Sequence, residues 1–286
     1  MTRRYLVTGG NKGIGLAVVR ALLTEVPDAH VFLGSRDRER GRAAVATLVE
    51  EDAAWAGRLE GLSLDVTDAA SVQAAATGLG EGGGKLTGIV NNAGIGLGSN
   101  DAAAVLAVNT WGPKRVCDAF IPLLDRDAPG RPRVVNVSSA SGPMYVARCA
   151  PDMQRRLVRP EVTWADVERL MQTYLAKAKT GGRNHYGFSK ACLNAYTIHL
   201  ARERPDLVVN ACTPGYIETD LTRPVAEARG AAPADLGMKP PSAATRVVLH
   251  LLVGDPGGSG WYFGSDAVRS PLDRYRGPGE PAYEGE

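Results

Sequence analysis

The chain has 286 residues, of which 44% are hydrophobic and 22% are charged. These proportions are ordinary for a globular protein, so the chain can bury a core without help from metals or disulfides. Its 33 Lys and Arg residues nearly balance its 31 Asp and Glu residues, and no long basic run occurs. A formal net charge of only +2 argues against a nucleic-acid partner.

The start of the chain and the cysteines indicate where the protein acts. The first residues pass directly into a short apolar strand, which is too short for a signal peptide or a membrane span. Cys117, Cys149, Cys192 and Cys212 are scattered, without the spacing of a disulfide framework. We therefore expect a cytoplasmic protein with no membrane partner. The histidines show no ligand spacing with Cys, Asp or Glu, so we expect no metal site.

Short aliphatic runs bounded by Gly, Asp, Asn or Pro are typical of buried strands, and they occur at residues 5–7, 31–33, 62–64, 89–90, 134–137 and 207–209. Stretches with helical spacing of Ala, Leu, Val and Ile lie between them, at residues 13–25, 37–51, 68–78, 101–124 and 185–204. The alternation predicts the α/β class, with a single Rossmann-type domain over residues 1–270. Its doubly wound parallel β-sheet should carry helices on both faces, with functional residues after the strands. Residues 271–286 are rich in Pro, Gly and charge, and we expect a flexible C-terminal tail.

A glycine-rich loop directly follows the first predicted strand and opens the first helix. It reads Thr8-Gly9-Gly10-Asn11-Lys12-Gly13-Ile14-Gly15. At this place, backbone N–H groups and the positive end of the helix can hold the pyrophosphate of a dinucleotide. A glycine-rich turn without a ligand is the alternative, because a lone pattern of this kind is weak evidence in a chain with 34 glycines.

The loop is the first of several motifs that occur in the order typical of one family. Its TGxxxGxG spacing is followed by Asp65-Val66, Asn91-Asn92-Ala93-Gly94, Asn109, Ser138-Ser139, Tyr186 with Lys190, and Pro214-Gly215 with Thr219. In these motifs the chain resembles the short-chain dehydrogenase/reductase family, which implies an oxidoreductase with a nicotinamide cofactor. The resemblance implies cofactor binding by Thr8, Gly9, Asn11, Lys12, Gly13, Ile14, Gly15, Arg36, Asp65, Val66, Asn92, Ala93, Gly94, Tyr186, Lys190, Pro214, Gly215, Ile217 and Thr219.

The end of the second predicted strand bears on the choice between NADPH and NADH. Enzymes of this architecture place an acid near the ribose 2′-OH of NAD, or a cation near the 2′-phosphate of NADP. Arg36 offers a planar fork suited to phosphate, and Lys12 adds a second positive charge. Asp37 would favour NAD if it faced the ribose, but Asp is also a preferred helix N-cap. We expect NADP(H), with Asp37 as the cap.

Tyr186 and Lys190 are four positions apart, which on a helix places both side chains on one face. A carbonyl oxygen that receives hydride needs a proton donor, and a phenol donates poorly at neutral pH unless a positive charge stabilises its phenolate. By resemblance to the family, Tyr186 is the general acid, Lys190 lowers its pKa and holds the nicotinamide ribose, Ser139 hydrogen-bonds the carbonyl oxygen, and Asn109 holds a water in the proton relay. Taken singly, each residue has an alternative reading as packing, surface, turn or cap.

The interval between Ser139 and Tyr186 is wider than in tetrameric family members and contains a helical insertion at about residues 142–183. Residues 164–180 have the pattern of a helix, with Thr163 and Asp166 as a capping box. An apolar stripe follows, formed by Val167, Leu170, Met171, Tyr174 and Leu175. The insertion resembles that of the monomeric carbonyl reductases of the family, in which it covers the face used elsewhere for oligomerisation. We therefore expect a monomer.

Two departures from those reductases concern the substrate side. The stretch at residues 95–108 is shorter, which should reshape the pocket, and Thr213 stands where a reactive cysteine is known. Met144, Tyr145, Tyr216 and Trp261 are candidates for an apolar pocket lining, although core packing explains each of them equally well.

The sequence thus predicts an NADPH-dependent carbonyl reductase acting on small-molecule ketones, aldehydes or quinones. An alcohol dehydrogenase working in the oxidative direction would use the same groups. A non-catalytic NADP-binding regulator could share the fold, but the presence of Tyr186 and Lys190 argues against it.

Overall fold

An eight-stranded sheet runs through the part of the chain that the computed structural model describes, which is residues 2–96, 101–128, 130–177 and 184–285. In spatial order the strands are β3 (Leu59–Ser63), β2 (Ala29–Ser35), β1 (Arg3–Thr8), β4 (Gly88–Asn91), β5 (Arg133–Val137), β6 (Val208–Cys212), β7 (Tyr262–Phe263) and β8 (Arg269–Ser270). Strands β1 to β7 pair in parallel, and β8 is antiparallel to β7. The order reverses around β1, which lies between β2 and β4, and this confirms the predicted doubly wound sheet. Ligands of such sheets bind at this reversal, beyond the carboxyl ends of the strands.

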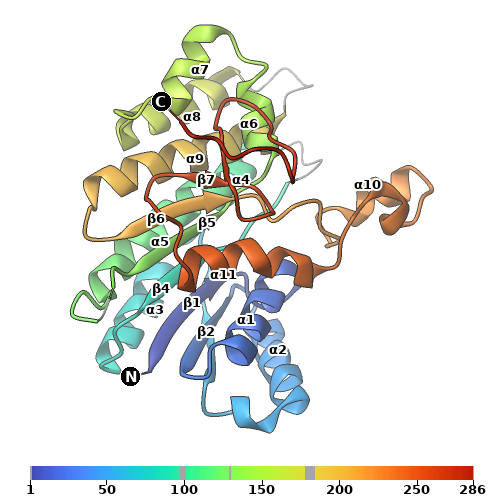
Figure 1. Cartoon of the computed structure of the whole chain (residues 1–286). Coiled ribbons are helices and arrows are strands. Elements are labelled where there is room, and N and C mark those ends of the chain that lie inside the picture. The colour runs from blue at the N-terminus through green and yellow to red at the C-terminus, as the bar shows by residue number, and fades with distance from the viewer. Residues whose placement is uncertain (1, 97–100, 129, 178–183, 286) are drawn as a thin grey trace.

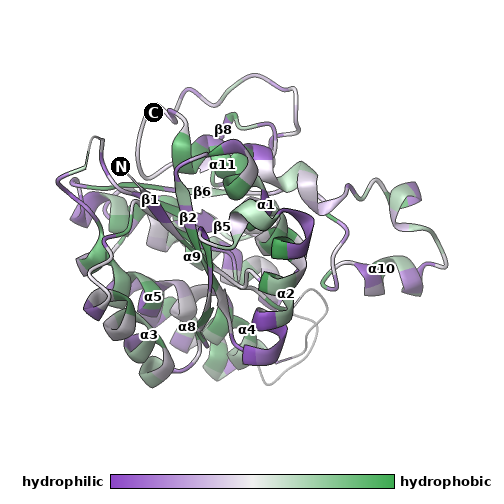
Figure 2. Cartoon of the chain, turned by 90° about the horizontal axis from the view of Figure 1, so that it is seen from below, coloured by the Kyte–Doolittle hydropathy of each residue, from purple (hydrophilic) through white to green (hydrophobic). Residues whose placement is uncertain are grey.

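Helices cover both faces of the sheet, as predicted (Figure 1). One face carries α1 (Gly13–Glu25), α2 (Arg38–Glu51) and α11 (Thr245–Val253), and the other carries α3 (Ala69–Glu81), α5 (Gly112–Phe120) and α9 (His185–Glu203). Alternate strand residues serve the two layers, because successive side chains point to opposite faces. Tyr5 and Val7 pack with the first set of helices, and Leu6 packs with the second. Figure 2 shows the sheet between the two helical layers, with α10 (Arg223–Ala228) projecting beyond them.

The outer strands differ from the prediction. The third strand, predicted at residues 62–64, is Leu59–Ser63, in which Leu59 is buried but Glu60 and Gly61 are exposed. An edge strand is partly solvated, so it lacks the continuous apolar run of the central strands. Strands β7 and β8 were not predicted, because two residues carry no measurable periodicity.

The helix predicted at residues 101–124 is wrong as a single unit. The structure divides it into α4 (Ala102–Leu106), a π-helical turn η2 (Ala107–Trp111), α5 and a 3-10 turn η3 (Ile121–Leu123). Pro122 has no backbone N–H and therefore favours an end of the α-helix near this position. The π turn inserts one residue into the helical register and so cannot be read from a 3.6-residue period. Further 3-10 turns are η1 (Ala53–Trp55), η4 (Pro233–Leu236) and η5 (Pro241–Ala244).

The insertion forms α6 (Ser141–Val146), α7 (Pro151–Val158) and α8 (Trp164–Lys177), which pack against α9 on the side away from the sheet. The capping box is confirmed: the Asp166 carboxylate accepts hydrogen bonds from the N–H (3.1 Å) and hydroxyl (2.7 Å) of Thr163, whose hydroxyl accepts the Asp166 N–H at 3.1 Å. The predicted stripe is buried at Val167, Leu170, Met171 and Tyr174. Residues 178–183, at the end of the predicted helix and insertion, lie outside the described residues.

The last part of the chain folds back against β8. Arg276 is almost fully buried, pairs with Asp266, and donates a hydrogen bond to the Ser270 hydroxyl at 2.8 Å. The Tyr283 N–H bonds the Arg269 carbonyl at 3.0 Å. The flexibility of the tail stays a prediction. The described helices include none with the length and apolar character that a membrane crossing needs.

Candidate active site

The end of β1 is tied to the end of β4 by a closed set of hydrogen bonds. The Thr8 hydroxyl accepts the N–H groups of Asn92 and Ala93, each at 3.0 Å. The Asn92 amide donates to the carbonyls of Thr8 at 3.0 Å and Gly9 at 3.1 Å. These hydrogen bonds hold two motifs that are far apart in the sequence next to each other. Asn92 lines the cavity described below, and Thr8 does not.

Two glycines allow the first helix to begin directly next to these motifs. Gly9 has a φ of +62°, which side chains rarely adopt. A Cβ on Gly15 would lie 2.2 Å from the Gly9 carbonyl oxygen and 2.5 Å from the Asn92 amide nitrogen, so no other residue fits there. Among the described residues, no side chain caps α1. The N–H groups of its first turn are left for an anion, in the way that suits a pyrophosphate.

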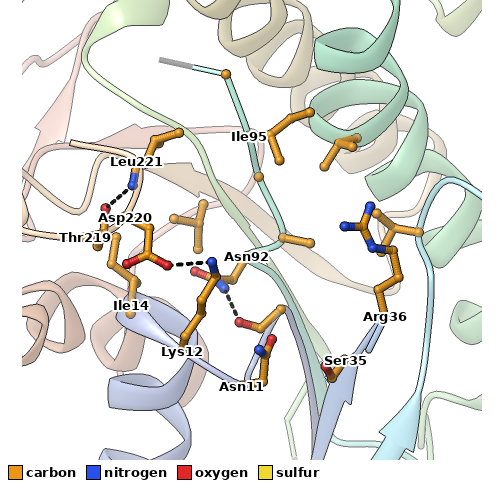
Figure 3. A pocket seen from close by; sticks show the side chains of 18 of the residues that line it. Asn11, Lys12, Ile14, Ser35, Arg36, Asn92, Ile95, Thr219, Asp220 and Leu221 are labelled. Carbon is orange, nitrogen blue, oxygen red and sulfur yellow. Dashed lines mark hydrogen bonds and ion pairs between the residues drawn. The ribbon is translucent and has the colours of Figure 1, made fainter. Parts of the chain in front are cut away.

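A cavity of about 520 Å³ opens above the glycine loop at the carboxyl ends of the central strands (Figure 3). Most of the predicted cofactor residues line it, namely Gly9, Asn11, Lys12, Gly13, Ile14, Arg36, Asp65, Val66, Asn92, Ala93, Gly94, Tyr186, Lys190, Pro214 and Thr219. Thr8, Gly15, Gly215 and Ile217 are not part of its wall. The sequence analysis missed several lining residues, among them Ser35, Arg40 and Thr67 near the ends of β2 and β3, and Glu218, Asp220 and Arg223 after β6.

The end of the cavity beyond β2 carries two arginines. Arg36 lines the cavity, and among the described residues it has no hydrogen bond or ion pair of its own. Asp37 is the N-cap of α2, because its carboxylate accepts the Arg40 N–H at 3.0 Å. This confirms the predicted cap. The Arg40 guanidinium also faces the cavity, 3.3 Å from Asp37. Arg40 lies three residues after the Asp37 cap, in the first turn of α2, and this position could have identified it from the sequence as a cavity residue.

Lys12, predicted to face the same phosphate region, pairs instead with Asp220 at 2.6 Å. Figure 3 shows the two side chains pointing toward each other, away from Arg36. On the β3 side, the Asp65 carboxylate accepts the N–H and hydroxyl of Thr67 at 2.9 and 2.7 Å, which fixes the turn next to Val66.

Tyr186 and Lys190 project from the same face of α9 into the cavity. The helix begins at an Asn184 cap, whose side-chain amide oxygen accepts the Gly187 N–H at 2.7 Å. The Lys190 ammonium donates to the Val137 carbonyl at 2.9 Å and lies 5.7 Å from the centre of the Tyr186 ring. Ser139, which follows β5, hydrogen-bonds the Tyr186 phenol. The structure thus brings three of the four predicted catalytic residues together.

Burial acts on the pKa values of both groups. It raises the pKa of the Tyr186 phenol above its ordinary value, and the hydrogen bond from Ser139 opposes this only in part. Burial lowers the pKa of the Lys190 ammonium to about 8. Both shifts favour the uncharged forms, and the lowered pKa brings the titration of Lys190 closer to neutral pH than that of an ordinary lysine.

Asn109 lies in the π turn and is fully buried. Its carbonyl oxygen accepts the Ile95 N–H at 3.0 Å, and its amide donates to the Ile95 carbonyl at 2.9 Å and the Ser189 hydroxyl at 3.0 Å. The side chain therefore joins the segment after β4 to α9 and does not line the cavity. Its proposed hold on a water stays a prediction. Residues 97–100, in the stretch predicted to reshape the substrate pocket, lie outside the described residues.

None of the four predicted pocket residues lines the larger cavity as far as the structure describes it. Met144 and Tyr216 are exposed, and Trp261 packs under the Arg269 guanidinium, 4.0 Å from its ring centre. Tyr145 lines a separate cavity of about 350 Å³ between the insertion and α9. Within the described ranges, no group of His, Cys, Asp or Glu side chains could hold a metal ion.

Comparison with known proteins identifies related sequences over most of the chain. The family described as short chain dehydrogenase matches residues 3–151. The (+)-neomenthol dehydrogenase of Arabidopsis thaliana is 35% identical over 257 residues, which cover 77% of this chain and 85% of that protein. Carbonyl reductase (NADPH) 1 of Homo sapiens is 32% identical over 267 residues, which cover 83% of this chain and 91% of that protein.

Solved structures agree with this similarity. Salutaridine reductase from Papaver somniferum is 27% identical with a TM-score of 0.75, and the match covers 91% of this chain and 99% of that one. The NADPH-bound carbonyl reductase from chicken fatty liver is 26% identical with a TM-score of 0.66, covering 92% of each chain.

We expect Lys190 to titrate at about pH 8 in the ligand-free protein, because burial disfavours its charged form. Between this pH and the ordinary lysine value of 10.5, the unfolded chain keeps a proton that the folded chain has released. The contribution of Lys190 to the free energy of unfolding should therefore rise with pH across this window. Lysine-selective ¹³C NMR measures the midpoint, with Lys190→Met to assign the signal. A midpoint as high as that of Lys85, whose pKa is raised by the Asp127 carboxylate, would contradict the expectation.

Proposed function

Since the chain belongs to the short-chain dehydrogenase family, we propose that it is an NADPH-dependent reductase that converts small-molecule ketones, aldehydes or quinones to alcohols. The observation that carries the proposal is that Tyr186 and the buried Lys190, one helical turn apart, both line the large cavity, with Ser139 hydrogen-bonded to the Tyr186 phenol. Relatives named carbonyl reductase (NADPH) support the substrate class and the cofactor.

The cavity fits a dinucleotide with a 2′-phosphate. The glycine loop and the uncapped start of α1 would hold the pyrophosphate. Arg36 and Arg40 would hold the 2′-phosphate, since Asp37 is already engaged as the α2 cap. Bound NADPH supplies the hydride, and the protein supplies orientation and charge.

The proton comes from Tyr186 in this proposal. A phenol with a raised pKa holds its proton firmly, so release to a developing alkoxide needs a nearby positive charge to stabilise the phenolate. The Lys190 ammonium, 5.7 Å from the ring, provides that charge in its protonated form. Ser139 orients the carbonyl oxygen toward the Tyr186 hydroxyl, and Asn109 keeps the facing segment at Ile95 in place.

Replacing Tyr186 with Phe should reduce turnover by about 10²–10⁴-fold, the typical contribution of a positioned general acid. NADPH oxidation is measured against a panel of ketones, aldehydes and quinones, and NADPH binding is measured by fluorescence titration. Tyr283→Phe, which removes a hydroxyl in the C-terminal segment, is the matched control. Equal rates for wild type and Tyr186→Phe would rule out this mechanism, and a wild type that binds NADPH without reducing any carbonyl would favour the non-catalytic regulator.

Replacing Arg36 with Glu should weaken NADPH binding about ten- to hundredfold and leave NADH binding nearly unchanged. The loss corresponds to one or more charge-assisted hydrogen bonds to the 2′-phosphate. Arg42→Glu makes the same charge change on an exposed part of α2 outside the cavity and serves as control. Equal weakening of both cofactors would remove Arg36 from the phosphate site.

The same groups can also work in the oxidative direction, because a general acid in one direction is the general base in the other. The relative named (+)-neomenthol dehydrogenase favours keeping this alternative. We further propose a reducing compartment such as the cytoplasm, which fits four cysteines that all carry free thiols.

We expect a monomer, because α6, α7 and α8 cover the outer side of α9. Met171 and Phe188 are buried in this contact, so the helix offers little apolar surface to a second copy. Sedimentation equilibrium should give a mass near the 30.2 kDa of one chain. A mass near twice or four times that value would overturn the expectation.

A further inference from the structure

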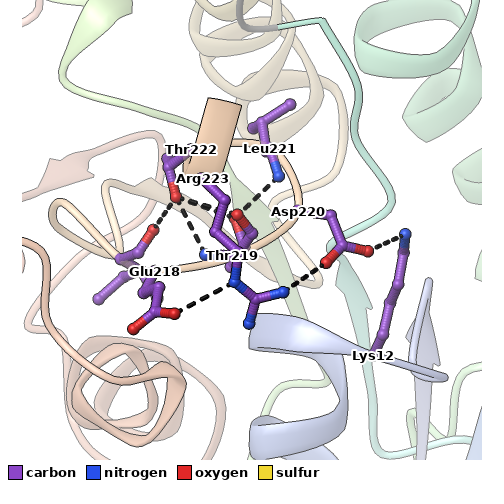
Figure 4. A network of polar contacts seen from close by, with 8 residues as sticks. Lys12, Glu218, Thr219, Asp220, Leu221, Thr222 and Arg223 are labelled. Atoms are coloured by element: carbon purple, nitrogen blue, oxygen red, sulfur yellow. Dashed lines mark hydrogen bonds and ion pairs between the residues drawn. The ribbon is translucent and has the colours of Figure 1, made fainter. Parts of the chain in front are cut away.

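A short segment after β6 lies against the glycine loop from the opposite side of the cavity. Within this segment, residues 218–223, Asp220 forms the ion pair with Lys12 (Figure 4). A Cβ on Gly13 would lie 3.3 Å from the Thr219 methyl group, so the Thr219 side chain packs closely on the glycine loop. Both Lys12 and Asp220 line the cavity, so the pair joins the glycine loop to residues 218–223 at its edge.

The segment also has ion pairs and hydrogen bonds of its own. Arg223 contacts Asp220 and Glu218, each at 3.1 Å. The Thr222 hydroxyl donates to the Ile217 carbonyl at 2.6 Å and accepts the Thr219 N–H at 2.9 Å. Among the described residues, the Lys12 contact is the ion pair that joins this segment to the glycine loop.

Lys12 is the N-cap residue of α1. The pair therefore stands at the helix end where a pyrophosphate binds. Lys12 holds the pKa of the Asp220 carboxyl below its ordinary value, so the pair is formed at neutral pH. A dinucleotide bound to the glycine loop would lie beside this ion pair, which joins the loop to residues 218–223.

We infer that Asp220 is a positioning residue that holds residues 218–223 against the glycine loop through its ion pair with Lys12, and that this contact slows dissociation of the bound dinucleotide. This inference rests on the proposed function. Loss of the Lys12–Asp220 ion pair should speed the dissociation of NADPH and of NADH equally, because the pair lies beside the pyrophosphate, which both cofactors contain. A purely electrostatic role predicts the opposite, since removing an acid near the phosphates would tighten binding, and more so for NADPH.

The test is Asp220→Asn, with Asp235→Asn as the matched control. Asp235 is exposed on η4 and outside the cavity. Dissociation of NADPH and of NADH is followed separately by stopped-flow fluorescence after mixing with excess oxidised cofactor. We expect both dissociation rates to rise about two- to fivefold in Asp220→Asn, a modest factor because both side chains are more than half exposed. The difference should shrink at high ionic strength, and the control should match wild type.

A second measurement needs no cofactor. In the ligand-free protein, amide hydrogen exchange over residues 218–223 should be faster in both Asp220→Asn and Lys12→Met than in wild type and Asp235→Asn. Unchanged exchange, unchanged dissociation rates, or slower release of NADPH alone would each overturn the inference. A wild type that binds neither cofactor would overturn the proposed function and this inference together, whereas the other negative outcomes leave the proposed function standing.

Discussion

The approach of Gly15 to the Gly9 carbonyl is the constraint on which the rest of the site depends. No Cβ fits at Gly15, and the same carbonyl receives the Asn92 amide from the end of β4. This contact places the start of α1 directly at the reversal of strand order, so uncapped N–H groups, the end of β4 and the end of β2 face one cavity. A larger residue at Gly15 would separate the helix from the sheet and disperse the anion site without touching a catalytic side chain.

The second constraint is the burial of α9 on nearly all sides. The sheet covers one side and the insertion covers the other, with Tyr174 stacked on Phe188 at 4.0 Å. This burial lowers the pKa of Lys190, since within the described residues its ammonium bonds a neutral carbonyl at Val137 and no carboxylate. The insertion therefore does more than cover a surface, because it helps to fix the helix that carries both reacting groups.

The sequence was informative where a residue type is dictated by its immediate neighbours along the chain. The Asp37 cap and the Thr163 and Asp166 box follow from local chemistry, and the fold followed from the alternation of elements. The motifs after the central strands were identified by their resemblance to a family. The π turn at Asn109 was not predictable, since one added residue leaves the apolar pattern almost unchanged. The Lys12 contact was not predictable either, because Asp220 meets it only after the whole sheet has formed.

The choice between NADPH and NADH depends on which cations around the cavity are already paired with acids, and a count of positive and negative residues does not show this. Lys12, Arg40 and Arg223 are each matched by an acid, namely Asp220, Asp37 and Glu218. Arg36 differs, since the described residues offer it no such partner. A 2′-phosphate would gain most from the cation whose pairing with an acid need not first be broken. Preference for NADPH therefore depends on how the acids are engaged, and the Asp37 cap contributes to it by occupying the carboxylate that could have bound a ribose hydroxyl.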